Sequence, residues 1–284
     1  MIHPAFSPGA VAVITGGASG IGLAAAKKLA SLGLRVCIAD LGPERLSRAR
    51  EAIAAAARGG DADVMTSETD VSRVEAIVAL EEAVRARFGG TNILMNNAGI
   101  GPRSSALGSE SWARTLDVNL WGVIHGVQVF VPGMIERGQP GLVINTGSKQ
   151  GITTPPGNPA YNVSKAGVKA FTEALQHELR NTAGGQLSAH LLIPGFVFTE
   201  LTAHGRAEKP AGAWTAEQTI DFMMDRLAQN DFYILCPDNE APRSLDERRI
   251  LWAAGDIVEN RPPLSRWHPD HAEAFKAFAA EKKG

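Results

Sequence analysis

Three side chains near the middle of the sequence have the types and spacing of an acid–base site. They are Ser148, Tyr161 and Lys165, in the stretch GSKQGITTPPGNPAYNVSK. Tyr161 and Lys165 are four residues apart, so in a helix they share one face and the ammonium lies beside the phenol. A nearby cation favours phenolate, which a tyrosine with an ordinary pKa of about 10 needs to accept a proton near neutrality. Ser148 ends an apolar, strand-like run, so we expect its hydroxyl at the same place.

A glycine-rich turn near the N-terminus predicts a dinucleotide-binding loop. The stretch VAVITGGASGIGLAAAKKLA runs from an apolar strand into an alanine-rich amphipathic helix. Gly16 would allow the tight turn, Gly20 the approach of a pyrophosphate to the backbone, and Gly22 the close packing of helix on sheet. The spacing is TGxxxGxG rather than GxGxxG, but backbone N–H groups and the helix N-terminus still point at the anion.

Taken together, these motifs resemble the short-chain dehydrogenase/reductase family over about residues 10–236. The segments that carry the resemblance occur in the family's order: TGGASGIG at 15–22, NNAG at 96–99, Asn119 in DVNLWG, Ser148, YNVSK at 161–165 and PGFVFT at 194–199. Two features depart from the family pattern. Lys149 directly follows the serine, and the chain continues for more than forty residues after the strand-like FYILC.

The resemblance implies an oxidoreductase that moves hydride between a secondary alcohol and a nicotinamide cofactor. Tyr161 would be the acid/base, Lys165 would lower its pKa and hold the nicotinamide ribose, and Ser148 would hydrogen-bond the substrate oxygen. Asn119, a polar amide in an apolar helical pattern, would hold a water that links the lysine to solvent. The implied cofactor-binding residues are Gly16, Ser19, Gly20, Ile21, Gly22, Asp40, Asp70, Val71, Asn97, Ala98, Gly99, Tyr161, Lys165, Pro194, Gly195, Val197 and Thr199.

The end of the second strand-like run favours NAD over NADP. Asp40 closes RVCIAD eighteen residues after Gly22, where a carboxylate accepts hydrogen bonds from ribose hydroxyls and repels a 2′-phosphate. Relatives that prefer NADP usually carry Arg or Lys in the glycine loop or just after this strand, and this chain has Ser19 and Leu41 there. Arg45 is near Asp40 in the sequence, and we expect it on the exposed face of a helix.

The pattern of the whole chain predicts an α/β fold. Strand-like and helix-like stretches alternate without a linker, which indicates a single Rossmann domain over residues 1–236, with a doubly wound, seven-stranded parallel sheet covered by helices on both faces. Strands are expected near 11–15, 35–39, 63–69, 92–96, 141–147, 187–193 and 232–236. Helices are expected near 20–32, 43–58, 72–88, 111–137, 159–181 and 215–229.

Composition narrows the classes of partner. A net charge of −2 and a pI near 6.4 provide no basic field for nucleic acid or anionic lipid, so a small-molecule substrate is expected. The N-terminus lacks a signal peptide's charged start and apolar core, and no apolar run reaches membrane-spanning length, so we expect a cytoplasmic protein. Cys37 and Cys236 lie in strand-like runs and are expected to be buried, reduced thiols, with no metal site.

Residues 237–284 form an extension with helix-like stretches, expected to pack on the same domain or on a neighbouring subunit. Trp252 and Trp267 carry large apolar area that must be buried, and the outer face of the domain is the favoured place. The resemblance implies a homodimer or homotetramer formed through the helices at 111–137 and 159–181. Apolar positions available for that contact are Leu116, Leu120, Val123, Val127, Phe171, Leu175 and Leu179.

Three alternatives to an NAD-dependent alcohol dehydrogenase stay open. A regulator that senses NAD or NADH without turnover could lose Tyr161 or Lys165 without harm, so the intact set counts against it. An NADPH-dependent ketoreductase would use the same acid–base residues in the opposite direction. A lyase of the halohydrin dehalogenase type shares the serine and tyrosine, but there arginine replaces the lysine and the nucleotide loop is lost.

Overall fold

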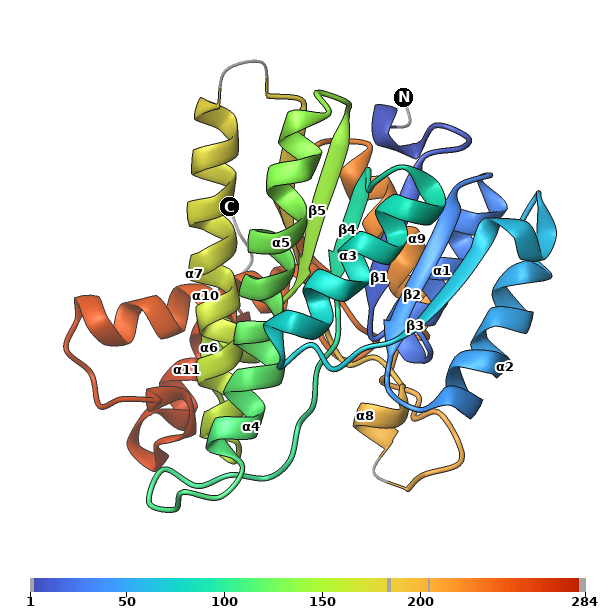
Figure 1. Ribbon diagram of the computed structural model, residues 1–284. Helices are drawn as coiled ribbons and strands as arrows, with labels where there is room; N and C mark the ends of the chain where they lie inside the picture. Colours follow the sequence, from blue (N-terminus) through green and yellow to red (C-terminus); the bar gives the residue numbers. More distant parts are fainter. Residues whose placement is uncertain (1–2, 183–184, 204, 281–284) are drawn as a thin grey trace.

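A parallel β-sheet lies at the centre of the molecule, between two layers of helices (Figure 1). The computed structural model describes residues 3–182, 185–203 and 205–280. Seven strands form the sheet: β1(Val11–Thr15), β2(Arg35–Asp40), β3(Val64–Glu68), β4(Ile93–Asn96), β5(Gly141–Thr146), β6(Leu187–Ile193) and β7(Tyr233–Leu235). Their order is β3-β2-β1-β4-β5-β6-β7, and every neighbouring pair is parallel. The predicted doubly wound α/β fold is confirmed.

Two apolar cores hold the helices against the sheet, one on each face. Consecutive strand residues point to opposite faces, so Val13 and Ile14 of β1 belong to different cores. One face is covered by α1(Gly20–Ser31), α2(Pro43–Ala54) and α9(Ala216–Leu227). The other face is covered by α3(Val74–Phe88), α5(Gly122–Glu136) and α7(Pro159–Asn181). Both faces of the sheet are therefore buried, which explains why a central strand such as β1 is buried along its whole length.

Local capping sets the start of the helix that carries the tyrosine. Asn158 precedes α7, its side chain accepts a hydrogen bond from the Tyr161 backbone N–H, and Pro159 occupies the first helical position. Tyr161 thus lies in the first turn of α7, and Lys165 lies one turn further on the same face.

Shorter elements complete the domain: η1(Pro4–Phe6), η2(Gly60–Asp63), α4(Trp112–Leu116), α6(Gln150–Thr153) and α8(Glu200–Ala203).

The helix expected at 111–137 is interrupted by a π-helical turn, η3(Asp117–Trp121), between α4 and α5. Asn119 lies in this turn and is fully buried. An 18-residue window within Trp112–Glu136 has a mean hydropathy of 1.4, so by length and composition alone this helical stretch of the described residues is long enough to cross a membrane, contrary to the expectation. Core helices of soluble proteins can have the same length and apolar composition, and α5 contributes Val127, Phe130 and Val131 to the core on the sheet.

The fold buries several of the residues proposed above for subunit contact inside the protomer. Val123, Val127, Leu175 and Leu179 are buried within the protomer, so they are not available to a second subunit, and this part of the expectation is wrong. The sequence pattern could not separate the sheet-facing side of each helix from its outer side. Trp121 and Val163, each 48% exposed, provide outward apolar area on the same two helices.

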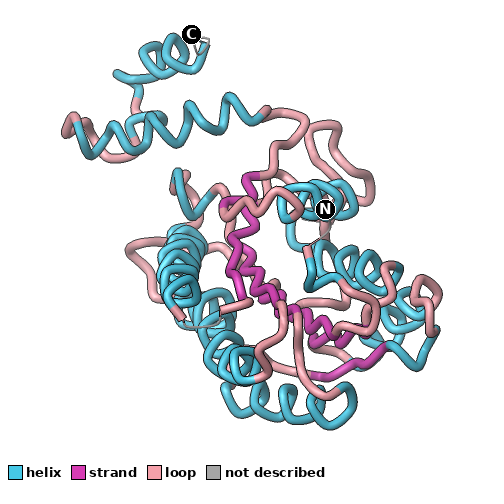
Figure 2. The backbone as a smooth tube through the Cα atoms, turned by 90° about the horizontal axis from the view of Figure 1, so that it is seen from above, coloured by secondary structure: helices cyan, strands magenta, loops and turns pink. Residues whose placement is uncertain are grey.

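The C-terminal extension projects from the body of the molecule (Figure 2). It contains α10(Arg243–Val258), η4(Ser265–Trp267), η5(Pro269–His271) and α11(Ala272–Ala280), and α10 packs against α6. Trp252 of α10 is buried, with ring contacts to Phe275 and Phe278, and its indole N–H donates to Ser265 Oγ at 2.8 Å. The extension therefore has a small core of its own, rather than burying Trp252 on the outer face of the domain as expected.

The two cysteines lie in the core as expected. Cys37 and Cys236 are free and buried, and burial raises the pKa of each thiol to about 12. Thiols with such pKa values are unreactive near neutrality. Within residues 3–182, 185–203 and 205–280, no group of three or more His, Cys, Asp or Glu side chains is arranged to hold a metal ion.

Candidate active site

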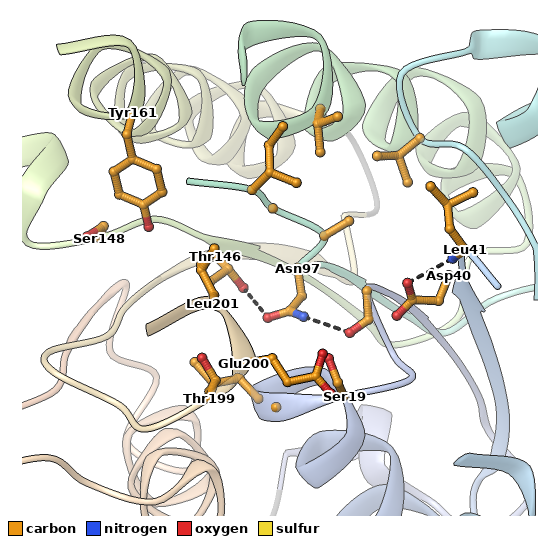
Figure 3. A pocket seen from close by; sticks show the side chains of 18 of the residues that line it. Ser19, Asp40, Leu41, Asn97, Thr146, Ser148, Tyr161, Thr199, Glu200 and Leu201 are labelled. Atoms are coloured by element: carbon orange, nitrogen blue, oxygen red, sulfur yellow. Dashed lines mark hydrogen bonds between the residues drawn. The ribbon is translucent and has the colours of Figure 1, made fainter. Parts of the chain in front are cut away.

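A cavity of about 860 Å³ lies at the carboxyl ends of the strands. The sequence predicted nineteen different site residues, and all of them line this cavity except Gly22 and Asn119. One end is formed by the glycine loop and Asp40, and the other by Ser148, Tyr161 and Lys165. Residues separated by more than a hundred positions in the chain therefore face one continuous space (Figure 3).

The glycine loop has the shape of a cradle for a phosphate group. Gly16 has φ +64°, and a Cβ there would lie 2.7 Å from Ala98 Cα. A Cβ on Gly22 would lie 2.2 Å from the Gly16 carbonyl oxygen, so the first turn of α1 can pack against the loop only without a side chain. Ser19 precedes α1 without making a side-chain capping bond, so the N-terminus of α1 opens toward the cavity that Ser19, Gly20 and Ile21 line. This end fits a dinucleotide pyrophosphate.

Asp40 lies at the end of β2 with its carboxylate held by backbone groups. Its Oδ2 accepts from Ala18 N at 2.9 Å, and its Oδ1 accepts from Leu41 N at 2.8 Å. Arg45, which sequence reasoning placed on an exposed helix face, also lines the cavity and forms an ion pair with Glu200 of α8. The pair joins α2 to α8, and no sequence motif indicated it.

Asn97 connects three strand ends. Its backbone N–H donates to Thr15 Oγ1 at 3.0 Å, and its side-chain amide donates to the Gly16 carbonyl at 3.2 Å. Its Oδ1 accepts from Thr146 Oγ1 at 3.3 Å, as shown by the dashed lines in Figure 3. Sequence reasoning included Asn97 but missed Thr15 and Thr146. Their only signal is their position as the last residues of β1 and β5.

Asp70 and Asn119 both fix backbone loops. Asp70 Oδ1 accepts from the backbone N–H and the hydroxyl of Ser72, at 3.0 and 2.7 Å, which forms a turn before α3. Asn119 Oδ1 accepts from Ile100 N at 2.8 Å, and its Nδ2 donates to the Ile100 carbonyl at 2.9 Å. Asn119 also donates to Ser164 Oγ at 3.2 Å. The π-helical turn thus pins the loop after β4 to α7.

The side chains of the proposed acid–base set converge at the other end of the cavity. The Tyr161 phenol points toward Ser148 (Figure 3). Burial raises the pKa of Tyr161, and the nearby Ser148 hydroxyl acts in the opposite direction. Lys165 is 4% exposed, donates to the Thr146 carbonyl at 2.8 Å and lies 5.7 Å from the centre of the Tyr161 ring. Burial lowers the pKa of Lys165 to about 8.

These values correct one expectation about Tyr161. The sequence predicted that Lys165 would lower the pKa of the phenol, but in the structure burial dominates and the net shift is upward. The physical reason is that the Lys165 ammonium is directed at a backbone carbonyl rather than at the phenol oxygen. The predicted proximity of the three side chains is found, and the predicted direction of the pKa shift is not.

Lys149, noted above as a departure from the family pattern, has two carboxylate partners. Its Nζ lies 3.0 Å from Asp238 Oδ2 and 2.5 Å from Asp246 Oδ2. Asp238 follows β7, whereas Asp246 lies in α10, so one ammonium joins the serine loop to the C-terminal extension. Burial raises the pKa of Asp246 despite Lys149. Burial also opposes ionisation of Asp238, but hydrogen bonds from Phe196 N–H and Lys149 hold its pKa below the usual value.

Comparison with known proteins shows the family of the chain. Residues 10–210 match the family model of the short chain dehydrogenases. The "Putative oxidoreductase SadH" of Mycobacterium tuberculosis is 39% identical over 173 residues, which cover 60% of this chain and 61% of that protein. The 1-deoxy-11-beta-hydroxypentalenate dehydrogenase of Streptomyces avermitilis is 30% identical over 248 residues, 85% of this chain and 89% of that protein.

Solved structures agree with the fold and with the kind of cofactor. A short-chain dehydrogenase/reductase from Burkholderia phymatum in complex with NAD has a TM-score of 0.80 and 33% identity, covering 91% of this chain and 97% of that one. An alcohol dehydrogenase from the archaeon Thermococcus sibiricus, complexed with 5-hydroxy-NADP, has a TM-score of 0.67 and 25% identity, covering 77% and 90%. The chain therefore belongs to the short-chain dehydrogenase/reductase family of nicotinamide-dependent oxidoreductases.

Proposed function

We propose that the protein is an NAD-dependent dehydrogenase that interconverts a mainly apolar secondary alcohol, with aryl-bearing alcohols among the candidates, and its ketone. The single observation that carries the proposal is that Ser148 and the Tyr161 phenol, which points toward it (Figure 3), line the same cavity as the glycine loop and Asp40. A bound nicotinamide dinucleotide supplies the hydride acceptor or donor. Everything else in the reaction is positioning and proton movement, and this chain's side chains can perform it.

Tyr161 is the group that we assign to proton transfer. In oxidation its phenolate oxygen accepts the hydroxyl proton of the alcohol, and in reduction its hydroxyl returns a proton to the carbonyl oxygen. Ser148 donates a hydrogen bond to the same substrate oxygen and stabilises the charge that develops there. Lys165 keeps a cation at the base of the site, held by the Thr146 carbonyl at 2.8 Å.

The surroundings of Tyr161 support an apolar substrate. Ile100 and Leu201 line the cavity at this end. Gly101 is close enough that a Cβ there would contact both Leu201 and Tyr161, at 3.4 and 3.9 Å. The wall beside the phenol is therefore largely hydrocarbon, which favours a substrate with apolar substituents on the carbinol carbon.

Asp40 supports NAD over NADP, and Arg45 is the observation that favours the second candidate. A carboxylate at the end of β2 suits a ribose with free hydroxyls and repels a 2′-phosphate. Arg45 lines the same cavity, but its guanidinium is paired with Glu200. Release of that pair would provide a phosphate partner, so an NADPH-dependent ketoreductase is the alternative to test beside the dehydrogenase.

The experiment is a screen of secondary alcohols and ketones with NAD(H) and NADP(H), followed by the absorbance of the reduced cofactor. We expect turnover of apolar secondary alcohols with NAD, and loss of that turnover in Tyr161→Phe. Turnover of ketones with NADPH alone would support the alternative. Binding of NAD without turnover of any alcohol or ketone would instead indicate a cofactor-sensing regulator.

A further inference from the structure

A second cavity, of about 320 Å³, lies between the body of the molecule and the C-terminal extension. Its walls come from α6 and Pro155, from the end of β7, and from α10 and η4. It shares no lining residue with the large cavity that holds the acid–base set. Its volume is in the range of small-molecule sites, about 300 Å³ and above. Nothing in the dehydrogenase chemistry proposed above uses it.

One side of this cavity is apolar. The residues that form it are Ile152, Pro155, Leu235, Ile250 and Trp267. Trp267 is 39% exposed, although the large apolar surface of a tryptophan side chain is usually buried. A planar hydrocarbon group about the size of one aromatic ring would bury this apolar surface.

The other side carries more positive than negative charge. Lys149 is satisfied by Asp238 and Asp246, both nearly buried. Arg249 reaches Asp246 only at 3.5 Å, and its Nε is buried without a hydrogen-bond partner. Lys149 and Arg249 share these two carboxylates. Arg266 also lines the cavity, so its three cations exceed the two carboxylates by one charge.

Arg266 is the least compensated of these cations. Its guanidinium lies over the rings of Trp267 and Phe275, at 4.7 and 5.0 Å from their centres, and no carboxylate of the described residues lies within ion-pair distance of it. Burial and the neighbouring Arg249 lower the pKa of Arg266. Both guanidinium groups line the same partly buried cavity, where an anion would stabilise them.

We propose that this cavity binds a singly charged carboxylate attached to an apolar ring. The carboxylate accepts hydrogen bonds from Arg249 and Arg266, including the unpartnered Arg249 Nε, and the ring packs on Trp267 and the apolar wall. A monoanion matches the single excess charge, whereas a phosphate dianion exceeds it. Because the walls belong to both α6 and α10, the ligand also fastens the extension to the turn that follows Ser148.

Benzoate is the probe that tests this proposal, by isothermal titration and by the shift of the thermal midpoint. Benzyl alcohol is the uncharged control, and inorganic phosphate distinguishes a general anion site. The variants are Arg249→Gln and Arg266→Gln, with Arg249→Lys and Arg266→Lys to retain charge. The matched control is Arg85→Gln, which removes an exposed arginine of α3 that is paired with Glu81. Circular dichroism verifies that each variant is folded.

We expect benzoate to raise the thermal midpoint and to bind at least about tenfold more weakly to each glutamine variant, while Arg85→Gln binds as the wild type does. The lysine variants should retain more affinity than the glutamine variants. Equal affinity for benzyl alcohol, stronger binding of phosphate, unchanged benzoate affinity in both glutamine variants, or no benzoate binding up to about 10 mM would overturn the proposal. The same titration on Tyr161→Phe separates this result from failure of the proposed dehydrogenase activity.

Discussion

The Lys149 ammonium lies 3.0 Å from Asp238 Oδ2, and the same carboxylate oxygen accepts a hydrogen bond from Phe196 N at 3.0 Å. Lys149 directly follows Ser148, and Phe196 lies in the loop after β6 that lines the large cavity through Pro194, Gly195 and Val197. One largely buried ion pair thus joins the residue after Ser148 to the neighbouring loop that follows β6. Asp246 extends the connection to α10.

Lys149→Met tests this connection. Removal of the cation leaves Asp238 without an ion-pair partner and Asp246 with only the more distant Arg249, for which we expect a loss of about 3 kcal/mol in the free energy of unfolding. The serine loop and the loop after β6 should also lose their fixed relation, so KM for alcohol and cofactor should rise more than kcat falls. Denaturant unfolding and steady-state kinetics measure the two effects.

Lys149→Arg is the matched control for that substitution, because it keeps the charge and should restore most of the stability and KM. Asp246→Asn, combined with Lys149→Met in a double-mutant cycle, measures the coupling between the extension and the serine loop. Additive effects of the two substitutions would show that α10 does not act through Lys149.

Tyr161→Phe should reduce turnover by about 10²- to 10⁴-fold while NAD binding persists, because only the acid–base oxygen is lost. Burial raises the pKa of the phenol, so little phenolate is present near neutrality. Oxidation, which needs phenolate, should therefore become faster as pH rises from 7 to 10 in the wild type. Steady-state rates across this range, with cofactor binding followed by fluorescence, provide the measurement. A variant with wild-type turnover would remove Tyr161 from the role.

Lys165→Met should change how stability depends on pH. Burial lowers the pKa of Lys165 to about 8 from 10.5, so between these values the unfolded chain binds more protons than the folded one. Stability of the wild type relative to Lys165→Met should therefore increase with pH, by about 2 kcal/mol between pH 7.5 and 9.5. Urea unfolding of both proteins at several pH values measures this difference. A difference that stays constant would show that Lys165 is not titrated in this range.

Asp40→Ala combined with Leu41→Arg should shift cofactor preference toward NADP. The first change removes repulsion of a 2′-phosphate, and the second supplies a partner for it. The ratio of kcat/KM values for NAD and NADP is the readout. Glu200→Gln is an informative companion, because it releases Arg45 and should improve NADP use further. Unchanged preference in the double variant would show that Asp40 does not face the ribose.

Assembly remains a prediction, and we expect at least a homodimer formed through α4–α5 and α7. Trp121 and Val163 are two of the exposed apolar side chains of these helices, so Trp121→Glu should weaken the dimer. Multi-angle light scattering at micromolar concentration measures the mass. A monomer mass near 30 kDa for the wild type would contradict the expectation. Truncation after Cys236 tests whether the extension blocks pairing at the β7 edge, in which case the dimer becomes a tetramer.

The sequence by itself determined the fold class and most of the site. Apolar runs bounded by glycine and proline predicted seven strands that the structure places in one parallel sheet. Asn97, Ser148 and Pro194 could be placed at strand ends because parallel strands bring their carboxyl ends to one edge. Gly16 and Gly22 could be recognised as loop glycines from their spacing in TGxxxGxG. The structure gives the reason for glycine, because a Cβ at either position would overlap with backbone atoms. These are local or periodic properties, which a sequence carries without long-range information.

Only the tertiary structure decided which side chains meet over long sequence distances. The ion pairs of Lys149 with Asp238 and Asp246 join residues about ninety positions apart, and no spacing rule predicts such a pair. The direction of the Tyr161 pKa shift likewise depends on burial and on the Thr146 carbonyl that turns Lys165 away from the phenol. Electrostatic energies depend on distance and desolvation in three dimensions, so the packed structure determines them and the order of residues does not.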